Sequence, residues 1–413
     1  MNANTDAITA IWGPQSDQGD GPLAGLRVLD LTSVILGAYA TQMLGDMGAA
    51  VIKVEAPAPD TGLDGDIMRW GGRQPANSAP GMGPLFLNYN RNKRSLMLDL
   101  KDAQSQQYIH QLVAQADVLV SIIRPAAMRR LRLDYATVSG IKPDIVYAQA
   151  VGFGSDGPYA GLPAYDDLIQ AASGGADLLP RTSGEDEPRY LPSLIADKTV
   201  GLYLLNAILA AVIQRQQSGQ GQYVEVPMLE CFTHFTMGEN LYGHTYQPPT
   251  QDYGYPRVLN PDRRPYRTAD GYLAVVPYSD EQWQAFFSLG GQPQLALDPR
   301  FRDYRSRTRH IVELYALIEP MLRQRTTGEW LRLLHEAGIP AMPVNRLHQV
   351  ADDPHLKAVG FFDQGDKAGL GRYQQLRHPV HFQRTPADLQ RAPPLPGEHT
   401  EEILKALHPD KNG

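Results

Sequence analysis

Apolar segments of strand length alternate with helical segments along the first part of the chain. Leu26–Leu31 (LRVLDL) is typical of a buried strand, Ala38–Gly48 has helical spacing and ends in glycine, and Val51–Glu55 (VIKVE) is the next strand. This order makes one βαβ unit, and parallel pairing of strands needs such a crossover. The alternation therefore predicts an α/β fold in which helices cover a sheet.

The same alternation continues to about residue 150, with one long interruption. Residues 57–84 are rich in proline, glycine and aspartate, so we expect a long loop, and loops of that length are usually functional or disordered. Beyond the loop, the pattern predicts strands at Ser95–Leu100, Asp117–Ser121 and Asp144–Ala150 and a helix at Ala103–Ala116. These elements extend the predicted sheet.

The pattern changes after residue 200, and a second, smaller domain is expected to begin at Gly271–Val276. Residues 242–267 are rich in Pro and Tyr and resemble a linker or surface loop. The helices predicted here are Val200–Gln217, Leu229–Gly238, Glu281–Leu289, Arg309–Gln324 and Thr327–Ala337, the last with Thr327 as N-cap, and the segment Tyr223–Pro227 separates the first two. Residues 350–413 carry little hydrophobic mass, so this tail should pack onto another part of the protein, whereas residues 1–22 have the composition of a loose polar leader.

Composition excludes several classes of protein. The chain has 413 residues, with 38 Lys and Arg against 45 Asp and Glu, and the net charge of −7 argues against a dedicated nucleic-acid binder. A single cysteine, Cys231, rules out a disulfide framework and a thiolate metal site within one chain. The longest apolar stretch, Leu202–Ile213, has about twelve residues, whereas a bilayer span takes ~20. Because no targeting segment is visible, we expect a cytoplasmic protein that does not enter a membrane.

Two patterns that resemble cofactor sites are weak. Residues 152–157 fit G-x-G-x-x-G after a strand, but Pro158 follows where a dinucleotide fold needs a helix, so a glycine-rich turn is favoured over a nicotinamide or flavin site. His234 and His244 are ten residues apart, and no second ligand stands near either at a metal-binding spacing. We therefore expect neither a metal nor a redox cofactor.

Two basic clusters and one aspartate remain as candidates for chemistry. The first cluster is Arg91, Lys93, Arg94 and Lys101, and the second is Arg124, Arg129, Arg130 and Arg132. Each cluster is either a solvated face or an anion site at the ends of adjacent strands, where helices begin. Asp197 lies between an apolar run and a long apolar helix. An N-cap of that helix is the favoured interpretation of Asp197, and a partly desolvated carboxylate in a cleft is the alternative.

Seven stretches, taken in order, carry a resemblance to a known family. They are 21–32 (GPLAGLRVLDLT), 44–57 (LGDMGAAVIKVEAP), 87–101 (LNYNRNKRSLMLDLK), 117–135 (DVLVSIIRPAAMRRLRLDY), 145–174 (IVYAQAVGFGSDGPYAGLPAYDDLIQAASG), 192–211 (PSLIADKTVGLYLLNAILAA) and 397–407 (GEHTEEILKAL). With them, the chain resembles the family III CoA-transferases, the CaiB/BaiF group, from about residue 22 to 408. These enzymes transfer CoA from an acyl-CoA to a free carboxylic acid.

The resemblance assigns roles to particular residues. It makes Asp197, within Ile195–Gly201, the nucleophile. It places a CoA pocket at Val34, Ile35, Leu98, Lys101, Ile122, Ile123, Arg124, Arg130 and Tyr165. It implies a leader at 1–22, a Rossmann-like large domain at 23–225, a linker and smaller α+β domain at 226–345, and a C-terminal segment at 346–413 that returns to the large domain. Two such chains would interlock as a homodimer.

The chemistry that the resemblance implies rests on a well-placed carboxylate. Asp197 would attack the thioester to give a mixed anhydride, and an aspartyl-CoA thioester would follow. Holding the partners in place supplies effective molarity, worth ~7–11 kcal/mol in good cases. Backbone amides at Gly174–Gly175 are one candidate for stabilising the oxyanion. An acyl-CoA and a small carboxylic acid are thus the expected partners, and Tyr and Pro residues of 240–280 are expected in the acyl pocket.

Departures from the family pattern narrow the range of expected substrates. Two rival functions also stay open. Ile35 stands where some members carry glutamine, Ala56 where they carry arginine, and residues 247–268 lack the glycine run of the formyl-CoA:oxalate enzymes, which puts oxalate and formyl-CoA in doubt. An α-methylacyl-CoA racemase of the same superfamily would use Asp166 and a histidine, yet no histidine occurs between residues 111 and 233. The other rival is an acyl-CoA-binding protein without activity.

Overall fold

The computed structural model describes residues 3–13, 21–76, 78–387 and 389–408, and these fall into two compact units. The larger unit takes its residues from 1–173, 192–235 and 354–413, and the smaller unit takes 174–191 and 236–353. The chain therefore leaves the larger unit and returns to it twice. The predicted domain limits at residues 22, 225 and 345 remain a prediction beside this division.

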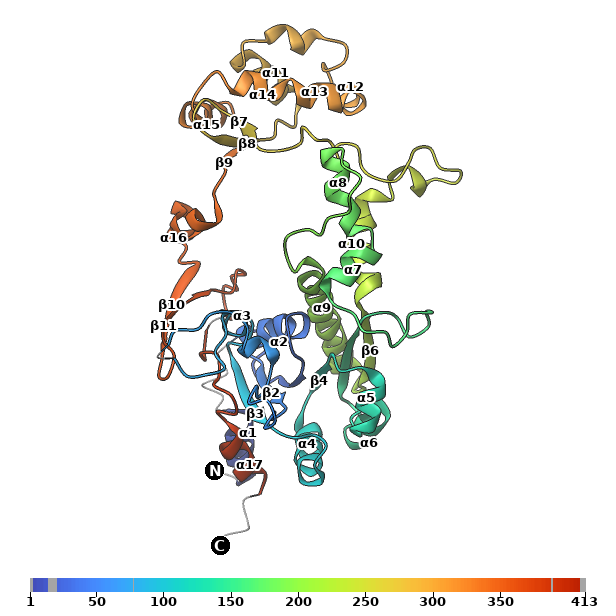
Figure 1. The fold of residues 1–413 in the computed structure, drawn as a ribbon, viewed down its shortest axis with the longest axis vertical. Helices are drawn as coiled ribbons and strands as arrows, with labels where there is room; N and C mark the ends of the chain where they lie inside the picture. The colour runs from blue at the N-terminus through green and yellow to red at the C-terminus, as the bar shows by residue number, and fades with distance from the viewer. Residues whose placement is uncertain (1–2, 14–20, 77, 388, 409–413) are drawn as a thin grey trace. The chain divides into compact units, whose positions relative to one another are not determined.

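A six-stranded parallel sheet forms the centre of the larger unit, as Figure 1 shows. Its order is β3-β2-β1-β4-β5-β6, which is the strand order of a doubly wound nucleotide-binding fold. The strands are β1 (Arg27–Leu31), β2 (Ala50–Glu55), β3 (Lys93–Met97), β4 (Val118–Ser121), β5 (Val146–Val151) and β6 (Gln222–Pro227). The predicted α/β class with a parallel sheet is thereby confirmed.

Both faces of this sheet are buried, because successive strand residues point to opposite sides. Val28 packs with the apolar faces of α2 (Leu36–Asp46) and α9 (Ile195–Ser218) on one side. Leu29 packs on the other side, where the helices are α4 (Ala103–Gln115), α5 (Pro125–Arg130) and α6 (Tyr135–Ile141) (Figure 1). Near-continuous apolar strands such as LRVLDL are explained by this double burial.

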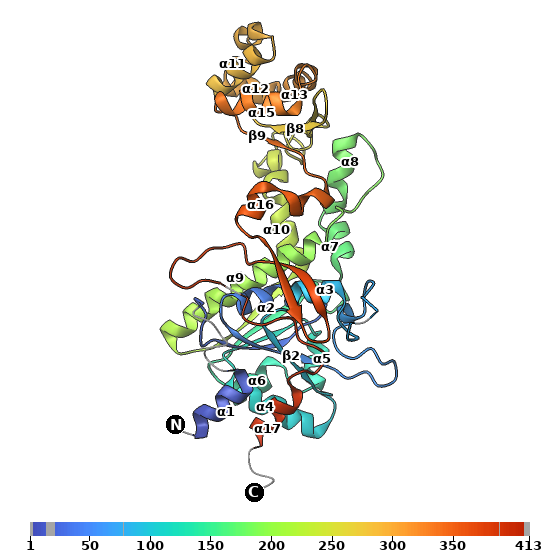
Figure 2. The same cartoon turned by 90° about the vertical axis from the view of Figure 1, so that its left-hand side faces the viewer.

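The two ends of the described chain meet beneath the sheet. Helix α1 (Ala3–Trp12) lies beside α17 (Thr400–Leu407), and Ile11, Trp12 and Ile403 are buried in the same core (Figures 1 and 2). The prediction of a loose leader at 1–22 is therefore wrong for the helical part, since apolar Ile11 and Trp12 anchor it; residues 1–2 and 14–20 of that leader lie outside the described residues. The prediction that the tail packs onto another part of the protein is confirmed.

The tail also contributes a two-stranded antiparallel hairpin, β10 (Phe362–Lys367) and β11 (Gly371–Leu376), which Figure 2 shows most clearly. The larger unit also contains α3 (Pro84–Tyr89), α7 (Asp166–Ala172) and α16 (Pro354–Ala358). Helix α10 (Met228–Asn240) begins in the larger unit and ends in the smaller one, to which α8 (Leu178–Ser183) belongs.

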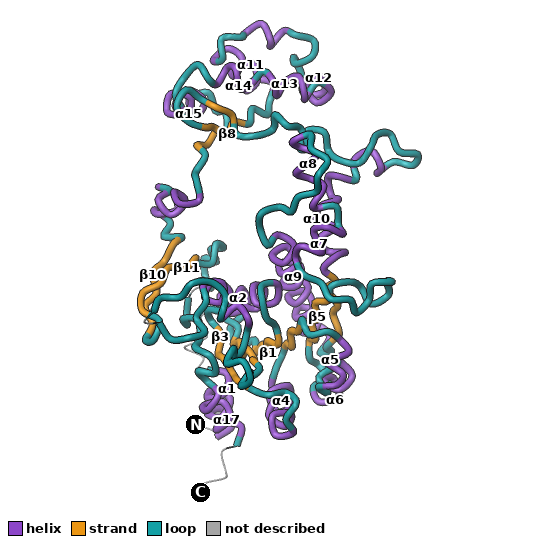
Figure 3. Tube along the Cα trace, viewed as in Figure 1, coloured by secondary structure: helices purple, strands orange, loops and turns teal. Residues whose placement is uncertain are grey.

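The smaller unit combines a short antiparallel sheet with helices, traced in Figure 3. Its strands are β7 (Tyr266–Arg267), β8 (Tyr272–Val275) and β9 (Ala341–Pro343), and its helices include α11 (Asp280–Leu289), α12 (Tyr304–Arg309), α13 (Ile311–Ala316), α14 (Ile318–Leu322) and α15 (Thr327–Glu336). Phe286, Phe287 and Trp330 are fully buried at its centre. Mixed helices and antiparallel strands agree with the α+β character predicted for this part.

Two helix predictions in the smaller unit are wrong in detail. The single helix predicted over Arg309–Gln324 is divided between α13 and α14, because Pro320 has no N–H to bond Ala316 and is tolerated only in a first turn. The N-cap of α15 is Thr326 rather than Thr327. The Thr326 hydroxyl accepts from the Glu329 N–H while the Glu329 carboxylate accepts from the Thr326 N–H, which is a capping box.

Helix α9 is the one described helix whose length and composition would allow it to cross a membrane. It instead supplies Val200, Leu204 and Ile208 to the core on the Val28 face of the sheet, and all three are fully buried. A central helix of a folded unit meets the same criteria of length and apolarity, so this helix is accounted for by the fold.

Candidate functional site

A cavity of about 700 Å³ opens at the carboxyl ends of the central strands in the larger unit. Residues 33–36 follow β1, Ile122 and Arg124 follow β4, and residues 150–153 end and follow β5, and all of them line it. The chain winds one way from β1 to β2 and β3 and the other way from β4 onward, so the cavity lies at the switch point where such sheets bind ligands. Its volume suits a large organic molecule.

Asp197 lines this cavity from the first turn of α9. The helix begins at Ile195, five residues before the predicted start, and its N-cap is Leu194, which makes no side-chain cap. The favoured interpretation of Asp197 as the N-cap is therefore wrong. The capping acceptor comes from another helix, because the Asp197 N–H donates to Asp166 Oδ1 at 2.9 Å, and Asp166 stands at the start of α7.

The environment of Asp197 favours the neutral form of its carboxyl group. Its side chain is buried, the residue being 8% exposed, and no hydrogen bond or ion pair to the carboxylate is present among the described residues. Burial, followed by the negative charges of Asp166 and Asp167, raises the pKa of Asp197 to about 7. A carboxyl group with a pKa in this range, facing a cavity, is typical of a functional residue.

Close packing of α9 on α2 fixes where Asp197 lies. Gly201, one turn after Asp197, meets the start of α2 so closely that a Cβ there would stand 2.8 Å from the carbonyl oxygen of Leu36. Only glycine allows this approach without a backbone shift. The first turn of α9 is thereby held against residues 35–36, which line the same cavity.

Three arginines line the cavity and have no partner of opposite charge. Arg124, Arg129 and Arg130 come from the start and end of α5, and none of them makes an ion pair with any described residue. The acidic lining residues are Asp197 and Glu225, and Glu225 already accepts the Ser155 N–H at 2.9 Å. Unpaired guanidinium groups at one cavity suit a phosphate-bearing ligand, so the second basic cluster fits the anion-site alternative.

Arg91, Lys93 and Arg94 of the first basic cluster have a different role from either one predicted, whereas Lys101 is exposed. Arg91 pairs with Asp46 at 2.5 Å, Lys93 with Asp30 at 3.1 Å and Arg94 with Glu402 at 2.7 Å, and the three basic side chains are almost fully buried. These residues are neither a solvated face nor lining of the cavity. They connect strand β3 and its neighbouring loops to the rest of the unit.

The structure brings together most of the predicted site residues. Seven of the ten line the cavity: Val34, Ile35, Ile122, Arg124, Arg130, Tyr165 and Asp197. Three do not line it. Leu98 is buried directly after β3, and Lys101 is exposed in the turn before α4. The Ile123 carbonyl oxygen accepts a hydrogen bond from the Gln149 side chain at 2.6 Å. Sequence reasoning missed Arg129, noted only as a member of the cluster, and Met228 at the start of α10, which carries no local signal.

The glycine-rich stretch after β5 is a turn, as favoured from the sequence. No helix follows Val151, and the chain turns through residues 152–161. Its amides meet carboxylates, because the Gly154 N–H donates to Glu230 at 2.9 Å. The Glu230 carboxylate therefore occupies the position at which a dinucleotide phosphate would accept from this amide.

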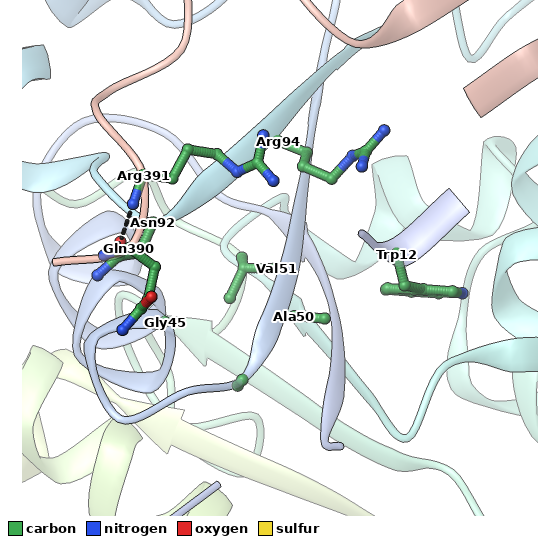
Figure 4. A pocket seen from close by; sticks show the side chains of 9 residues that line it. Trp12, Gly45, Ala50, Val51, Asn92, Arg94, Gln390 and Arg391 are labelled. Carbon is green, nitrogen blue, oxygen red and sulfur yellow. Dashed lines mark hydrogen bonds between the residues drawn. The ribbon is translucent and has the colours of Figure 1, made fainter. Parts of the chain in front are cut away.

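Among the smaller cavities elsewhere in the described residues, two are informative. One of about 20 Å³, drawn in Figure 4, lies between Trp12, Arg94, Asn92 and Arg391 and has room for about one water molecule. Another of about 320 Å³ lies within the smaller unit and is lined by tyrosines, prolines and arginines, among them Tyr255. It includes several of the Tyr and Pro residues of 240–280 that were expected around the acyl group, which remains a prediction.

Known proteins are similar in sequence to this chain over almost its whole length. The sequence profile described as CoA-transferase family III matches residues 23–400. The chain belongs to this family. A succinate–glutarate CoA-transferase of Agrobacterium fabrum is 31% identical over 94% of this chain and 96% of its own length. A human succinyl-CoA:glutarate CoA-transferase is 29% identical over 95% of this chain and 88% of its own length.

Solved structures of family III CoA-transferase relatives have the same fold. The crystal structure of Rv3272 from Mycobacterium tuberculosis gives a TM-score of 0.78 at 31% identity and covers 92% of this chain and 98% of that one. A CaiB/BaiF family protein from Brucella suis gives 0.76 at 30% identity, covering 94% and 99%. The protein is accordingly an enzyme of the CoA-transferase type, and enzymes of this type use CoA thioesters as substrates.

Proposed function

We propose that this enzyme transfers CoA from an acyl-CoA to a free carboxylic acid through covalent intermediates on Asp197. The observation that carries the proposal is the Asp197 carboxyl group, buried without a hydrogen-bond partner among the described residues, in the cavity that three unpaired arginines also line. A poorly solvated carboxylate is a better nucleophile than one in water, because no hydration shell must be removed.

Four steps complete a turnover. The ionised Asp197 attacks the thioester carbonyl, which forms a mixed anhydride and releases the CoA thiolate. The thiolate attacks the aspartyl carbonyl, forming an aspartyl-CoA thioester and freeing the donor acid. The acceptor carboxylate then attacks this thioester, giving a second mixed anhydride and the thiolate again. Attack of the thiolate on the acceptor's acyl carbon gives the new acyl-CoA and restores the Asp197 carboxylate.

The remaining lining divides between the two ends of the ligand. Arg124, Arg129 and Arg130 would bind the phosphates of CoA, and the apolar residues Val34, Ile35 and Met228 would contact its uncharged part. Leu98, Lys101 and Ile123 stay proposed contacts that the family resemblance alone supports. The same holds for Gly174–Gly175 as donors to the oxyanion.

The acceptor is proposed to be a small dicarboxylic acid. Relatives at 29–31% identity carry the names succinyl-CoA:glutarate or succinate–glutarate CoA-transferase, which supports an acid of four or five carbons. Ile35 in place of glutamine and the lack of a glycine run in residues 247–268 argue against oxalate. An interlocked homodimer in the cytoplasm is proposed from the family resemblance.

Covalent capture tests this function. Protein incubated with succinyl-CoA and then hydroxylamine should lose activity and carry a hydroxamate at Asp197 by peptide mass spectrometry. Asp197→Ala should bind CoA and transfer it at background rate. Asp167→Asn, at the exposed neighbouring carboxyl, is the matched control and should keep transfer activity.

A negative result would be plain. Full transfer by Asp197→Ala, or turnover with no adduct at Asp197, would remove it from the mechanism. Deuterium exchange at the α-carbon of an acyl-CoA without any acceptor acid would favour racemase chemistry instead, and CoA binding without turnover across a panel of acids would favour a binding protein.

A further inference from the structure

Val34, in the wall of the cavity, has an unusual backbone conformation. It follows β1 directly after Thr32 and Ser33, and its φ is +62°. A β-branched residue almost never adopts a left-handed φ, because its Cβ then crowds the backbone, at a cost of roughly 1–3 kcal/mol. Strain of this kind persists only where surrounding contacts enforce it.

One buried ion pair holds both ends of this turn. The Val34 N–H donates to Asp66 Oδ1 at 3.1 Å, and Asp66 Oδ2 pairs with Lys53 Nζ at 3.1 Å. Lys53 Nζ also donates to the Thr32 carbonyl oxygen at 2.6 Å. The Lys53 and Asp66 side chains are completely buried. The Thr32 carbonyl, two residues before the strained residue, and the Val34 amide are therefore tied together through two side chains.

Further buried contacts fix this ion pair in turn. The Asp66 N–H donates to Glu55 Oε2 at 2.9 Å, and Glu55 pairs with the buried Arg69 at 2.5 Å. From the other side, Asp30 Oδ1 accepts the Thr32 N–H at 2.9 Å. The long loop after β2, which the sequence marks as unusual, thus delivers Asp66 to the base of the turn.

We propose that Asp66 is a positioning residue that, with Lys53, holds Val34 in its strained conformation and so shapes the cavity wall for the acyl-CoA. The proposal rests on the proposed function, because it takes acyl-CoA as the ligand of this cavity. Asp66 itself does not line the cavity, so its effect on the ligand would pass through Val34. Without Asp66, Val34 relaxes to a negative φ, and the chain that leads into Ile35 and Leu36 changes direction.

The strain itself provides the test. Asp66→Ala should weaken CoA binding and lower kcat/KM for the acyl-CoA by about 10- to 100-fold, the range expected for a small misplacement of a binding wall. Glycine adopts φ near +60° without a Cβ penalty, so it does not need the ion pair. Asp66→Ala made in a Val34→Gly background should therefore cost several-fold less than the same change made in the wild type.

A matched control separates positioning from general loss of stability. Asp46 is equally buried and paired with Arg91 in the same unit, but it does not line the cavity. Asp46→Ala should lower the melting temperature, while its effect on CoA affinity should be the same in the wild-type and Val34→Gly backgrounds. Equal losses from Asp66→Ala in both backgrounds would overturn the proposal.

Two readouts keep the result decisive. Affinity for CoA, measured by calorimetry, reports on the wall even if transfer fails, so the failure of this proposal and of the covalent mechanism are distinguishable. If Asp66→Ala does not fold, hydrogen exchange on the wild-type protein decides the question. The Val34 amide should then exchange as slowly as the amides of β1, and rapid exchange would show that Asp66 does not hold it.

Discussion

The rate of CoA transfer should rise with pH through neutrality, because the proposed nucleophile is buried. The first step needs the ionised Asp197, and burial with the charges of Asp166 and Asp167 raises its pKa to about 7. At pH 6, about one tenth of the free enzyme would carry the carboxylate, so kcat/KM for the acyl-CoA should be about one tenth of its plateau. An aspartate with the usual value of 3.8 would give no change over this range.

The same shift predicts a pH dependence of stability with a definite sign. The pKa of Asp197 in the folded state lies above the unfolded value of 3.8, so the folded protein binds this proton more tightly. The stabilisation of the folded state by the protonated carboxyl group is therefore fully present below pH 3.8 and is lost as the pH rises through about 7. At 1.36 kcal/mol per pKa unit, raising the pH through 7 should lower the unfolding free energy of the wild type by at most about 4 kcal/mol. Asp197→Asn has no carboxyl group at this position and should not show this decrease.

Initial rates at low acyl-CoA between pH 5.5 and 8.5, and urea unfolding of wild type and Asp197→Asn at pH 4.5 and 8, measure the two effects. Asp167→Asn, which removes one nearby charge from an exposed position, should move the rate profile to lower pH. A flat rate profile over this range, with equal unfolding free energies for both proteins at pH 8, would refute the assignment of a raised pKa to Asp197.

Three further predictions follow from single contacts. Gly201→Ala should destabilise the protein by about 1–3 kcal/mol in chemical denaturation, because its Cβ would meet the Leu36 carbonyl oxygen, whereas Gly140→Ala, with no atom within 4 Å, should not. Arg130→Ala should weaken CoA binding in calorimetry about tenfold or more, with less dependence on salt than the wild type. Thr326→Ala should cost about 1 kcal/mol of unfolding free energy through loss of the capping box.

Each of these outcomes has a counterpart that would contradict it. Equal stability of the Gly201 and Gly140 variants would show that α2 and α9 do not approach as closely as described. Loss of turnover with unchanged CoA affinity would take Arg130 out of phosphate binding. An unchanged melting curve for Thr326→Ala would mean that this helix end is not limiting for unfolding.

The layered sheet could be predicted from the sequence because its signals are local. Runs such as VIKVE are buried on both faces, so apolar content and strand length suffice to find β2 within one residue. The start of α9 could not be found in this way. Its capping acceptor is Asp166, 31 residues earlier in the chain, and no neighbouring residue indicates where the helix begins.

The site was predicted unevenly for the same reason. Ile122 follows β4 directly and Arg130 ends the short helix α5 after it, so strand position already places both near the cavity. Lys93 resembled an anion-binding residue because its partner Asp30 lies 63 residues away, and only the folded chain shows that its charge is already neutralised. The pKa of Asp197 likewise depends on burial and on α7, neither of which a linear pattern contains.

The packing of α17 under the sheet has a consequence for how this enzyme is made. Ile403 belongs to the same core as Leu29, so the two must meet although nearly the entire polypeptide is synthesised between them. The smaller unit is synthesised before α17, so this face of the sheet stays partly uncovered while the smaller unit is being made. Until then the apolar strands of this face are exposed to other nascent chains, so productive folding of this enzyme depends on whether α17 packs before aggregation occurs.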